Sequence, residues 1–143
     1  MTAPLAPDPS PVTLVMQGAG YGVPGKTILH GLDAHLDMRR VGVVGRNGSG
    51  KSTLARLVAG LIAPTAGRVT VNGHDMARDR RAALRAVGIL FQNPDHQIIF
   101  PTVLEEMAFG LMQLGQPKGE AEEEARAVLA RYGKAHWEAV HVT

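Results

Sequence analysis

One stretch of the chain has the residue types and spacing to bind a phosphate group. Residues 45–53 read Gly-Arg-Asn-Gly-Ser-Gly-Lys-Ser-Thr, which matches the P-loop pattern G-x-x-x-x-G-K-[ST]. Glycines let a backbone curl so that its N–H groups point inward, where phosphate oxygens accept them. The ammonium of Lys51 adds a full charge for the β- and γ-phosphates, and the hydroxyl of Ser52 is a ligand for a shared Mg²⁺.

The segments beside this stretch are those that a P-loop requires. Residues 41–44 form a short apolar run without polar alternation, which is typical of a buried strand. Between Lys51 and Leu61 the apolar residues repeat with helical spacing, and Gly60 and Pro64 bound the expected helix. A strand, a glycine-rich loop and a helix in this order favour a nucleotide-binding loop over a chance glycine-rich turn.

The remaining pattern predicts an α/β protein, because segments with strand character alternate with helical ones. Strands are expected at residues 12–16, 27–36, 68–71 and 87–91. Helices are expected at residues 78–86, 103–114 and 120–132. The glycine-rich residues 18–22 are predicted to be a loop, and Asn72-Gly73 predicts a tight turn. Thr102 and Glu105 have the spacing of a capping box.

Length and composition limit the possible classes of protein. The chain has 143 residues, 45% of them hydrophobic, which suits about one domain with a packed core. A net charge of +2 and an aromatic content of 4% do not favour a nucleic-acid partner. The absence of cysteine excludes a disulfide framework, an iron–sulfur cluster and a thiolate zinc site.

The wider pattern resembles the ATP-binding subunit of ABC transporters. Tyr21 lies upstream of the P-loop, where that family has an aromatic residue that stacks on adenine, and residues 67–75 resemble a hairpin of the family. Residues 87–94 resemble the strand that leads to its Q-loop, with Gln92 as the glutamine. The resemblance implies an α/β P-loop NTPase fold. This chain would hold the N-terminal part of the nucleotide-binding domain, with an antiparallel β subdomain and the start of the helical subdomain.

Residues 91–110 narrow the resemblance to energy-coupling-factor importers, which move vitamins, cobalt or nickel. Residues 98–101, Ile-Ile-Phe-Pro, look most like the biotin branch. The resemblance implies a subunit that couples ATP binding and hydrolysis to uptake of such a substrate. Its implied partners are a second ATPase subunit, in a homo- or heterodimer, and a membrane coupling protein. Its implied location is cytoplasmic, peripheral on the inner face of the cell membrane.

The resemblance also implies which residues bind ATP and Mg²⁺. The expected nucleotide-binding residues are Tyr21, Gly45, Arg46, Asn47, Gly48, Ser49, Gly50, Lys51, Ser52, Thr53 and Gln92. Ser52 and Gln92 are also expected to reach Mg²⁺. The alternatives are an exposed loop aromatic for Tyr21 and a polar strand end for Gln92. His96 is interpreted as a surface or hinge residue, and the arginines between residues 78 and 85 as a solvated helix face.

Three motifs of the family are not found in the sequence. They are the signature motif, the Walker B strand and the later switch histidine. No residue is therefore assigned a catalytic role, and we expect nucleotide binding with little turnover by this chain alone. The chain is interpreted as an ATPase subunit truncated before these motifs.

The expected organisation has three parts. Residues 1–11, with four prolines, are expected to be a disordered tail. Residues 12–92 are the expected nucleotide-binding core, and residues 93–143 the Q-loop exit and the incomplete helical subdomain. Other functions stay open: a non-catalytic nucleotide-binding or regulatory module, the relic of an interrupted ATPase gene, or a small-molecule kinase.

Overall fold

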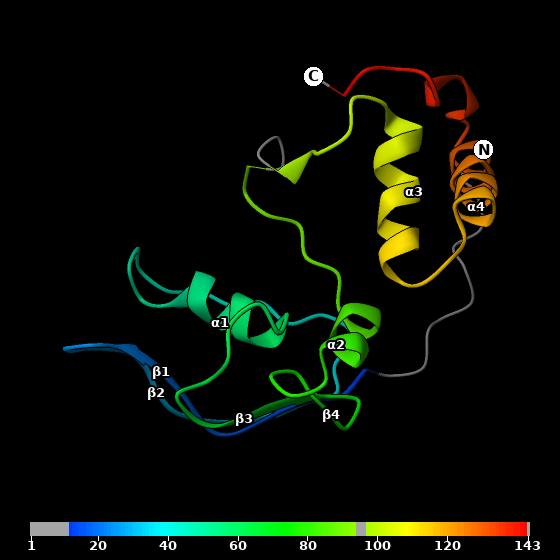
Figure 1. Ribbon diagram of the computed structural model, residues 1–143. Coiled ribbons are helices and arrows are strands. Elements are labelled where there is room, and N and C mark those ends of the chain that lie inside the picture. The colour runs from blue at the N-terminus through cyan, green and yellow to red at the C-terminus, as the bar shows by residue number, and fades with distance from the viewer. Residues whose placement is uncertain (1–11, 94–96, 143) are drawn as a thin grey trace. The chain divides into compact units, whose positions relative to one another are not determined.

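The chain divides into two compact units, and the boundary falls between Ile89 and Leu90 (Figure 1). The computed structural model describes residues 12–93 and 97–142. The expected tail at residues 1–11 and the position of His96 lie outside the described residues.

The first unit is built on an antiparallel sheet of four strands. The strands are β1 (Leu14–Val23), β2 (Lys26–Leu36), β3 (Ala66–Val71) and β4 (His74–Asp75), in the spatial order β2-β1-β3-β4 (Figure 1). Asn72 and Gly73 connect β3 to β4 with φ angles of 50° and 80°, as a type I′ turn requires. The turn predicted from Asn72-Gly73 is confirmed.

The glycine-rich residues 18–22 belong to a strand, so the loop predicted there is wrong. β1 runs through them with register shifts against β2, and Gly18 takes a φ of 56°. The Gly18 N–H donates to Oδ1 of Asp33 on β2 at 2.7 Å. Bulges of this kind let a strand continue past residues in the left-handed conformation, which glycine adopts at little cost.

The core of the first unit lies between the sheet and two helices, α1 (Lys51–Val58) and α2 (Arg80–Ala86). Leu57 of α1 is 1% exposed and packs among buried residues of the sheet. Leu61, expected on the same helical stripe, is 41% exposed. The helix ends before it, and Gly60 takes a φ of 67°, a common way for a helix to end.

The two buried strands expected at residues 41–44 and 87–91 are not formed. Val44 is 94% exposed and Leu90 is 86% exposed. A buried parallel strand needs neighbours that take up its backbone N–H and C=O groups. Within residues 12–93 and 97–142, no strand pairs with either segment. The apolar composition was identified correctly, but the hydrogen-bonded strands and their burial were predicted wrongly.

The second unit is a helical hairpin of α3 (Val103–Gln113) and α4 (Lys118–Arg131), followed by the short helix η2 (Ala135–Trp137). Small buried side chains lie on the two helices: Ala108 on α3, and Ala121 and Ala125 on α4. The predicted capping box at the start of α3 is confirmed. Oγ1 of Thr102 accepts the Glu105 N–H at 3.3 Å, and Oε2 of Glu105 accepts the Thr102 N–H at 3.3 Å.

Residues 138–142 close this unit against the start of α3. The N–H of Val103 donates to the Val140 carbonyl at 3.1 Å, and the N–H of Leu104 donates to the Glu138 carbonyl at 3.2 Å. These bonds satisfy N–H groups that a helix N-terminus leaves without an intrahelical partner. In the part of the chain that the structure describes, no helix has both the length and the apolar character to cross a bilayer.

Candidate nucleotide-binding site

The expected phosphate-binding residues form one continuous loop that leads into α1. The loop turns at Gly48 and Gly50, whose φ angles are 81° and 91°, and both values lie in the region that favours glycine. The Ser49 N–H donates to the Arg46 carbonyl at 3.2 Å and closes a turn. Residues 45–49 are exposed, so their backbone groups are accessible from solvent.

The end of the loop forms the N-terminus of α1. Gly50 is the N-cap, no side chain caps the helix, and the first turn contains no acidic residue. The N–H groups of the first turn therefore lack the side-chain acceptor that caps many helices. Together with the partial positive charge of a helix N-terminus, they favour a bound anion.

Gly50 also fixes the loop against the sheet. A Cβ atom built on Gly50 would lie 2.7 Å from Cδ2 of Leu29 on β2, whereas one on Gly48 would meet nothing within 4 Å. The loop therefore approaches β2 closely at Gly50 and stands clear of other atoms at Gly48. Leu29 was not among the expected site residues, and an apolar residue inside a strand carries no sequence signal for such a role.

The ammonium of Lys51 is bound to the loop itself. Its Nζ atom donates to the carbonyls of Gly45 at 2.7 Å and Arg46 at 2.8 Å. These acceptors are neutral, whereas a phosphate is negatively charged and attracts the ammonium by a charge–charge interaction as well. A phosphate at the helix N-terminus can therefore compete for this ammonium.

The donor set at the loop is suited to a magnesium ion that is shared with phosphates. Ser52 is an exposed residue in the first turn of α1, so its hydroxyl is accessible. In the described part of the chain, no group of three or more His, Cys, Asp or Glu residues could hold a metal. Mg²⁺ is commonly held by one or two protein oxygens together with phosphate oxygens and waters, so a lone hydroxyl fits that arrangement.

The structure places Tyr21 and Gln92 in different units. Tyr21 lies in β1, opposite Leu29 of β2, and it packs against the core. Its position in a paired strand rules out the alternative of an exposed loop aromatic. Gln92 is an exposed residue of the second unit, so the site described in the first unit is built without it.

The comparison with protein families decides the identity of this fold. The family model described as ABC transporter matches residues 31–143. The chain belongs to the ABC transporter family. Membership implies that the domain binds a nucleotide.

Relatives of known name make the assignment more specific. The chain is 53% identical to the biotin transport ATP-binding protein BioM of Rhodobacter capsulatus, over 88% of this chain and 51% of that protein. It is 40% identical to the energy-coupling factor transporter ATP-binding protein EcfA of Methanothermobacter thermautotrophicus, over 86% of this chain and 41% of that protein. The chain spans about half the length of the curated relatives it matches.

A solved structure supports the fold. The structure of cbiO1 from Clostridium perfringens, described as part of the ABC transporter complex cbiONQ, matches this chain with a TM-score of 0.70 and 26% sequence identity. The match covers 92% of this chain and 54% of cbiO1. The predicted α/β P-loop NTPase fold is confirmed, and so is the resemblance to an ABC ATPase subunit of the energy-coupling-factor type.

Proposed function

We propose that this chain is the nucleotide-binding part of an energy-coupling-factor ABC importer and that it binds ATP with Mg²⁺. The observation that carries the proposal is the loop at the N-terminus of α1. It combines an uncapped first turn with the Lys51 ammonium, which lies 2.7 and 2.8 Å from two loop carbonyls. In the proposal, the phosphates of ATP accept the first-turn N–H groups and draw Lys51 away from those carbonyls.

The remaining roles are proposed from the P-loop motif and from the resemblance to ABC ATPases. The Ser52 hydroxyl would hold Mg²⁺, which when bound neutralises charge on the phosphates. Tyr21 on β1 pairs with Leu29 on β2, the residue that Gly50 of the loop approaches closely. In the proposal, Tyr21 stacks on the adenine. Gln92, which matches the family's Q-loop glutamine, is proposed as a further Mg²⁺ ligand that responds to the membrane partner. Gly45, Arg46, Asn47, Gly48, Ser49 and Thr53 complete the proposed phosphate cradle.

The proposed cargo and partners rest on the relatives. BioM is named for biotin transport and EcfA for an energy-coupling factor transporter. We therefore propose a vitamin such as biotin as the cargo of the full importer, with cobalt or nickel as the alternative. The proposed partners are a second ATPase subunit and a membrane coupling protein at the cytoplasmic face of the membrane.

The test of nucleotide binding is calorimetric titration with ATP in the presence of Mg²⁺. Lys51→Ala removes the charge that meets the phosphates, and we expect it to weaken binding by at least about tenfold, the effect of roughly 1.4 kcal/mol. Lys26→Ala removes an exposed lysine of β2 and should leave the affinity unchanged. Equal affinities in the wild-type protein and the Lys51→Ala protein would overturn the proposal.

Turnover is a separate question from binding. The sequence assigns no residue to orient the attacking water, so we expect phosphate release from ATP by the isolated chain to stay near the buffer background. Steady hydrolysis that disappears in Lys51→Ala would contradict this expectation. Binding without turnover would equally suit a non-catalytic module, which hydrolysis assays with a partner ATPase subunit would distinguish.

A further inference from the structure

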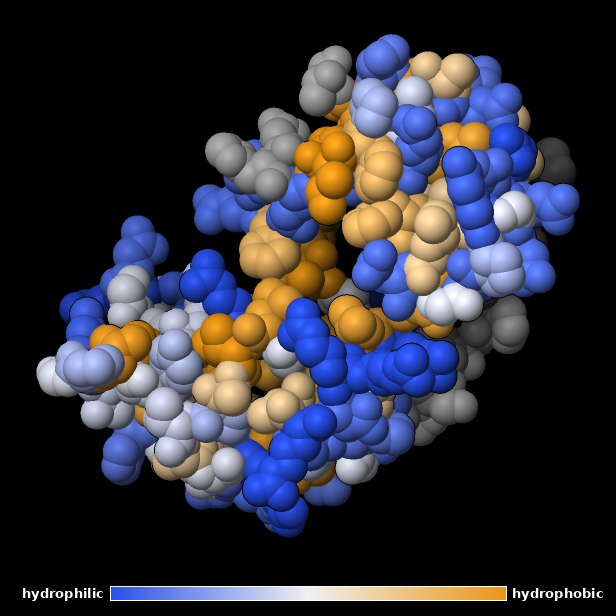
Figure 2. Space-filling model, viewed as in Figure 1, coloured by the Kyte–Doolittle hydropathy of each residue, from blue (hydrophilic) through white to orange (hydrophobic). Residues whose placement is uncertain are grey.

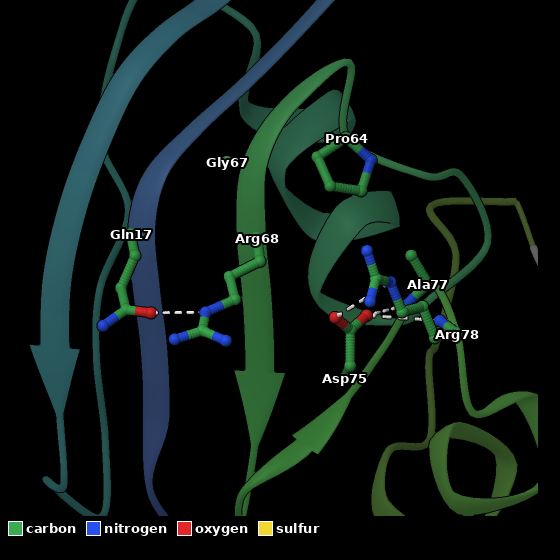
Figure 3. A pocket seen from close by; sticks show the side chains of 7 residues that line it. All are labelled: Gln17, Pro64, Gly67, Arg68, Asp75, Ala77 and Arg78. Carbon is green, nitrogen blue, oxygen red and sulfur yellow. Dashed lines mark hydrogen bonds and ion pairs between the residues drawn. The ribbon is translucent and has the colours of Figure 1, made fainter.

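The first unit has a polar pocket on the face of the sheet that points away from its core. Its volume is about 440 Å³, and none of the P-loop residues lines it (Figure 3). Met16 of β1 pairs with Val69 of β3, and both are buried in the core. The next residues, Gln17 and Arg68, pair with each other, and they face the opposite side because side chains alternate along a strand.

Arg68 lines this pocket with a guanidinium that has one hydrogen bond among the described residues. Its Nε atom donates to Oε1 of Gln17 on the neighbouring strand, which fixes the plane of the group (Figure 3). A guanidinium has five N–H groups in a planar fork. Among the described residues no acceptor is recorded for the four on Nη1 and Nη2. Such a fork matches two oxygens of a phosphate or carboxylate.

The other side of the pocket is the turn after β4. Oδ1 of Asp75 accepts the N–H of Ala77 at 3.0 Å and the N–H of Arg78 at 3.2 Å. Its Oδ2 lies 3.9 Å from Nε of Arg78. Among the described residues that line the pocket, Asp75 alone carries a carboxylate, and the turn engages it. The side chain of Arg78 is 89% exposed and carries a second guanidinium at the pocket (Figure 3).

The charge of the surrounding unit favours an anionic ligand. Residues 12–89 contain eleven lysines and arginines but only four acidic residues, whereas residues 90–142 contain four basic and eight acidic residues. A surplus of one sign raises the local concentration of ligands of the other sign. The small net charge of the whole chain, +2, conceals this difference between its two parts.

We propose that the pocket between Arg68 and Arg78 binds a phosphate group, independently of the P-loop. Its volume lies within the roughly 300–1,000 Å³ of small-molecule sites, which leaves room for the rest of a phosphate-bearing molecule. Two guanidinium groups beside one engaged carboxylate suit a phosphate, which offers more oxygens and more charge than a carboxylate does. The phosphate belongs either to a small soluble molecule or to a phospholipid headgroup.

The test uses the Lys51→Ala chain, in which the P-loop lacks its own phosphate-binding charge. Binding of inorganic phosphate to the chain is followed by ³¹P NMR. Binding to membranes is measured by sedimentation of the chain with vesicles of phosphatidylglycerol, and vesicles of phosphatidylcholine alone are the control. We expect Arg68→Gln to weaken binding by about tenfold, because it removes charge-assisted hydrogen bonds. Arg78→Gln should weaken it in the same direction. Arg56→Gln removes an exposed arginine of α1 that is outside the pocket, and it should change the affinity by less than about twofold.

The outcomes separate the two sources of the phosphate. If the chain binds inorganic phosphate and Arg68→Gln weakens that binding, the ligand is a soluble molecule. If the chain binds only to phosphatidylglycerol vesicles and Arg68→Gln weakens that binding, the ligand is a phospholipid headgroup. If neither probe binds, or if Arg56→Gln weakens binding as much as Arg68→Gln, the proposal is wrong. If Arg68→Gln does not fold, the same comparison is made with Arg78→Gln. The Arg78 side chain is almost fully exposed, so its replacement should have little effect on stability. The proposed ATP site is tested separately through Lys51 in the Arg68→Gln chain.

Discussion

At the scale of single residues, the site depends on the backbone conformation of Gly50 and on the ammonium of Lys51. Gly50 combines a φ of 91° with a close approach to Leu29, and Lys51 is held by two carbonyls. The motif could be recognised in the sequence because its glycines and lysine have a fixed spacing. The contact with Leu29 could not, because only the fold brings β2 to the loop.

The two glycines of the loop should respond differently to alanine. Both Gly50→Ala and Gly48→Ala force a left-handed residue, at roughly 1–2 kcal/mol. Gly50→Ala also crowds Leu29, and overpacking adds about 1–3 kcal/mol. We expect urea unfolding to show a larger loss of stability for Gly50→Ala than for Gly48→Ala. Equal losses would mean that the contact with Leu29 is not tight in solution.

Glu106 should hold the segment before α3 in place. Its Oε2 accepts the N–H groups of Ile99 at 2.9 Å and Phe100 at 2.8 Å, and the Phe100 ring lies 5.0 Å from that of Phe109. Glu106→Ala leaves two N–H groups without this acceptor, so we expect faster hydrogen exchange at both amides and a loss of about 1–3 kcal/mol.

The control for this change is Glu123→Ala, which removes an exposed carboxylate of α4 with no recorded hydrogen bond. It should leave exchange at Ile99 and Phe100 as it is in the wild-type protein. If Glu106→Ala also leaves that exchange unchanged, the two hydrogen bonds do not order the segment.

At the scale of elements, local chemistry was predictable and long-range pairing was not. The capping box of Thr102 and the turn at Asn72-Gly73 depend on residues close in sequence, and both were predicted correctly. The loop at residues 18–22 was predicted wrongly, because bulges and pairing with β2 outweigh the preference of glycine for turns. The strands predicted at residues 41–44 and 87–91 are wrong for a related reason, because an apolar run forms a strand only when a neighbouring strand pairs with it.

The contact between α3 and α4 should depend on the small size of its residues. Ala121 and Ala125 are fully buried on α4, so the helices approach each other without room for larger side chains. Ala125→Leu should therefore lower the free energy of unfolding by about 1–3 kcal/mol through overpacking. Ala130→Leu enlarges an exposed position of the same helix and should have little effect in thermal unfolding. If the two variants unfold alike, the helices are not closely packed at Ala125.

At the scale of the whole molecule, the first unit leaves apolar surface uncovered. A groove of about 490 Å³ runs between β1, β2 and α1, and Met38, Val41, Val43 and Ile89 contribute to its lining. Figure 2 shows orange, apolar side chains at the surface of this unit among blue polar ones. Large exposed apolar surfaces of this kind bind apolar ligands or other chains.

The groove should bind an apolar dye. We expect anilinonaphthalene sulfonate to fluoresce strongly with the folded chain, and Val43→Lys to reduce the signal by placing a charge in the groove. Val23→Lys changes an exposed valine outside the groove, 45% exposed against 55% for Val43, and should leave the signal unchanged. A signal that is insensitive to Val43→Lys would place the dye elsewhere.

The bonds between residues 138–142 and the first turn of α3 should keep the beginning of that helix from fraying. Helix ends normally fray first, yet here the beginning of α3 is protected by carbonyls that follow η2 in the sequence. Loss of the Glu138 and Val140 carbonyls would expose the amides of Leu104 and Val103, about 35 residues upstream, so a change after η2 would loosen the start of a helix that precedes it.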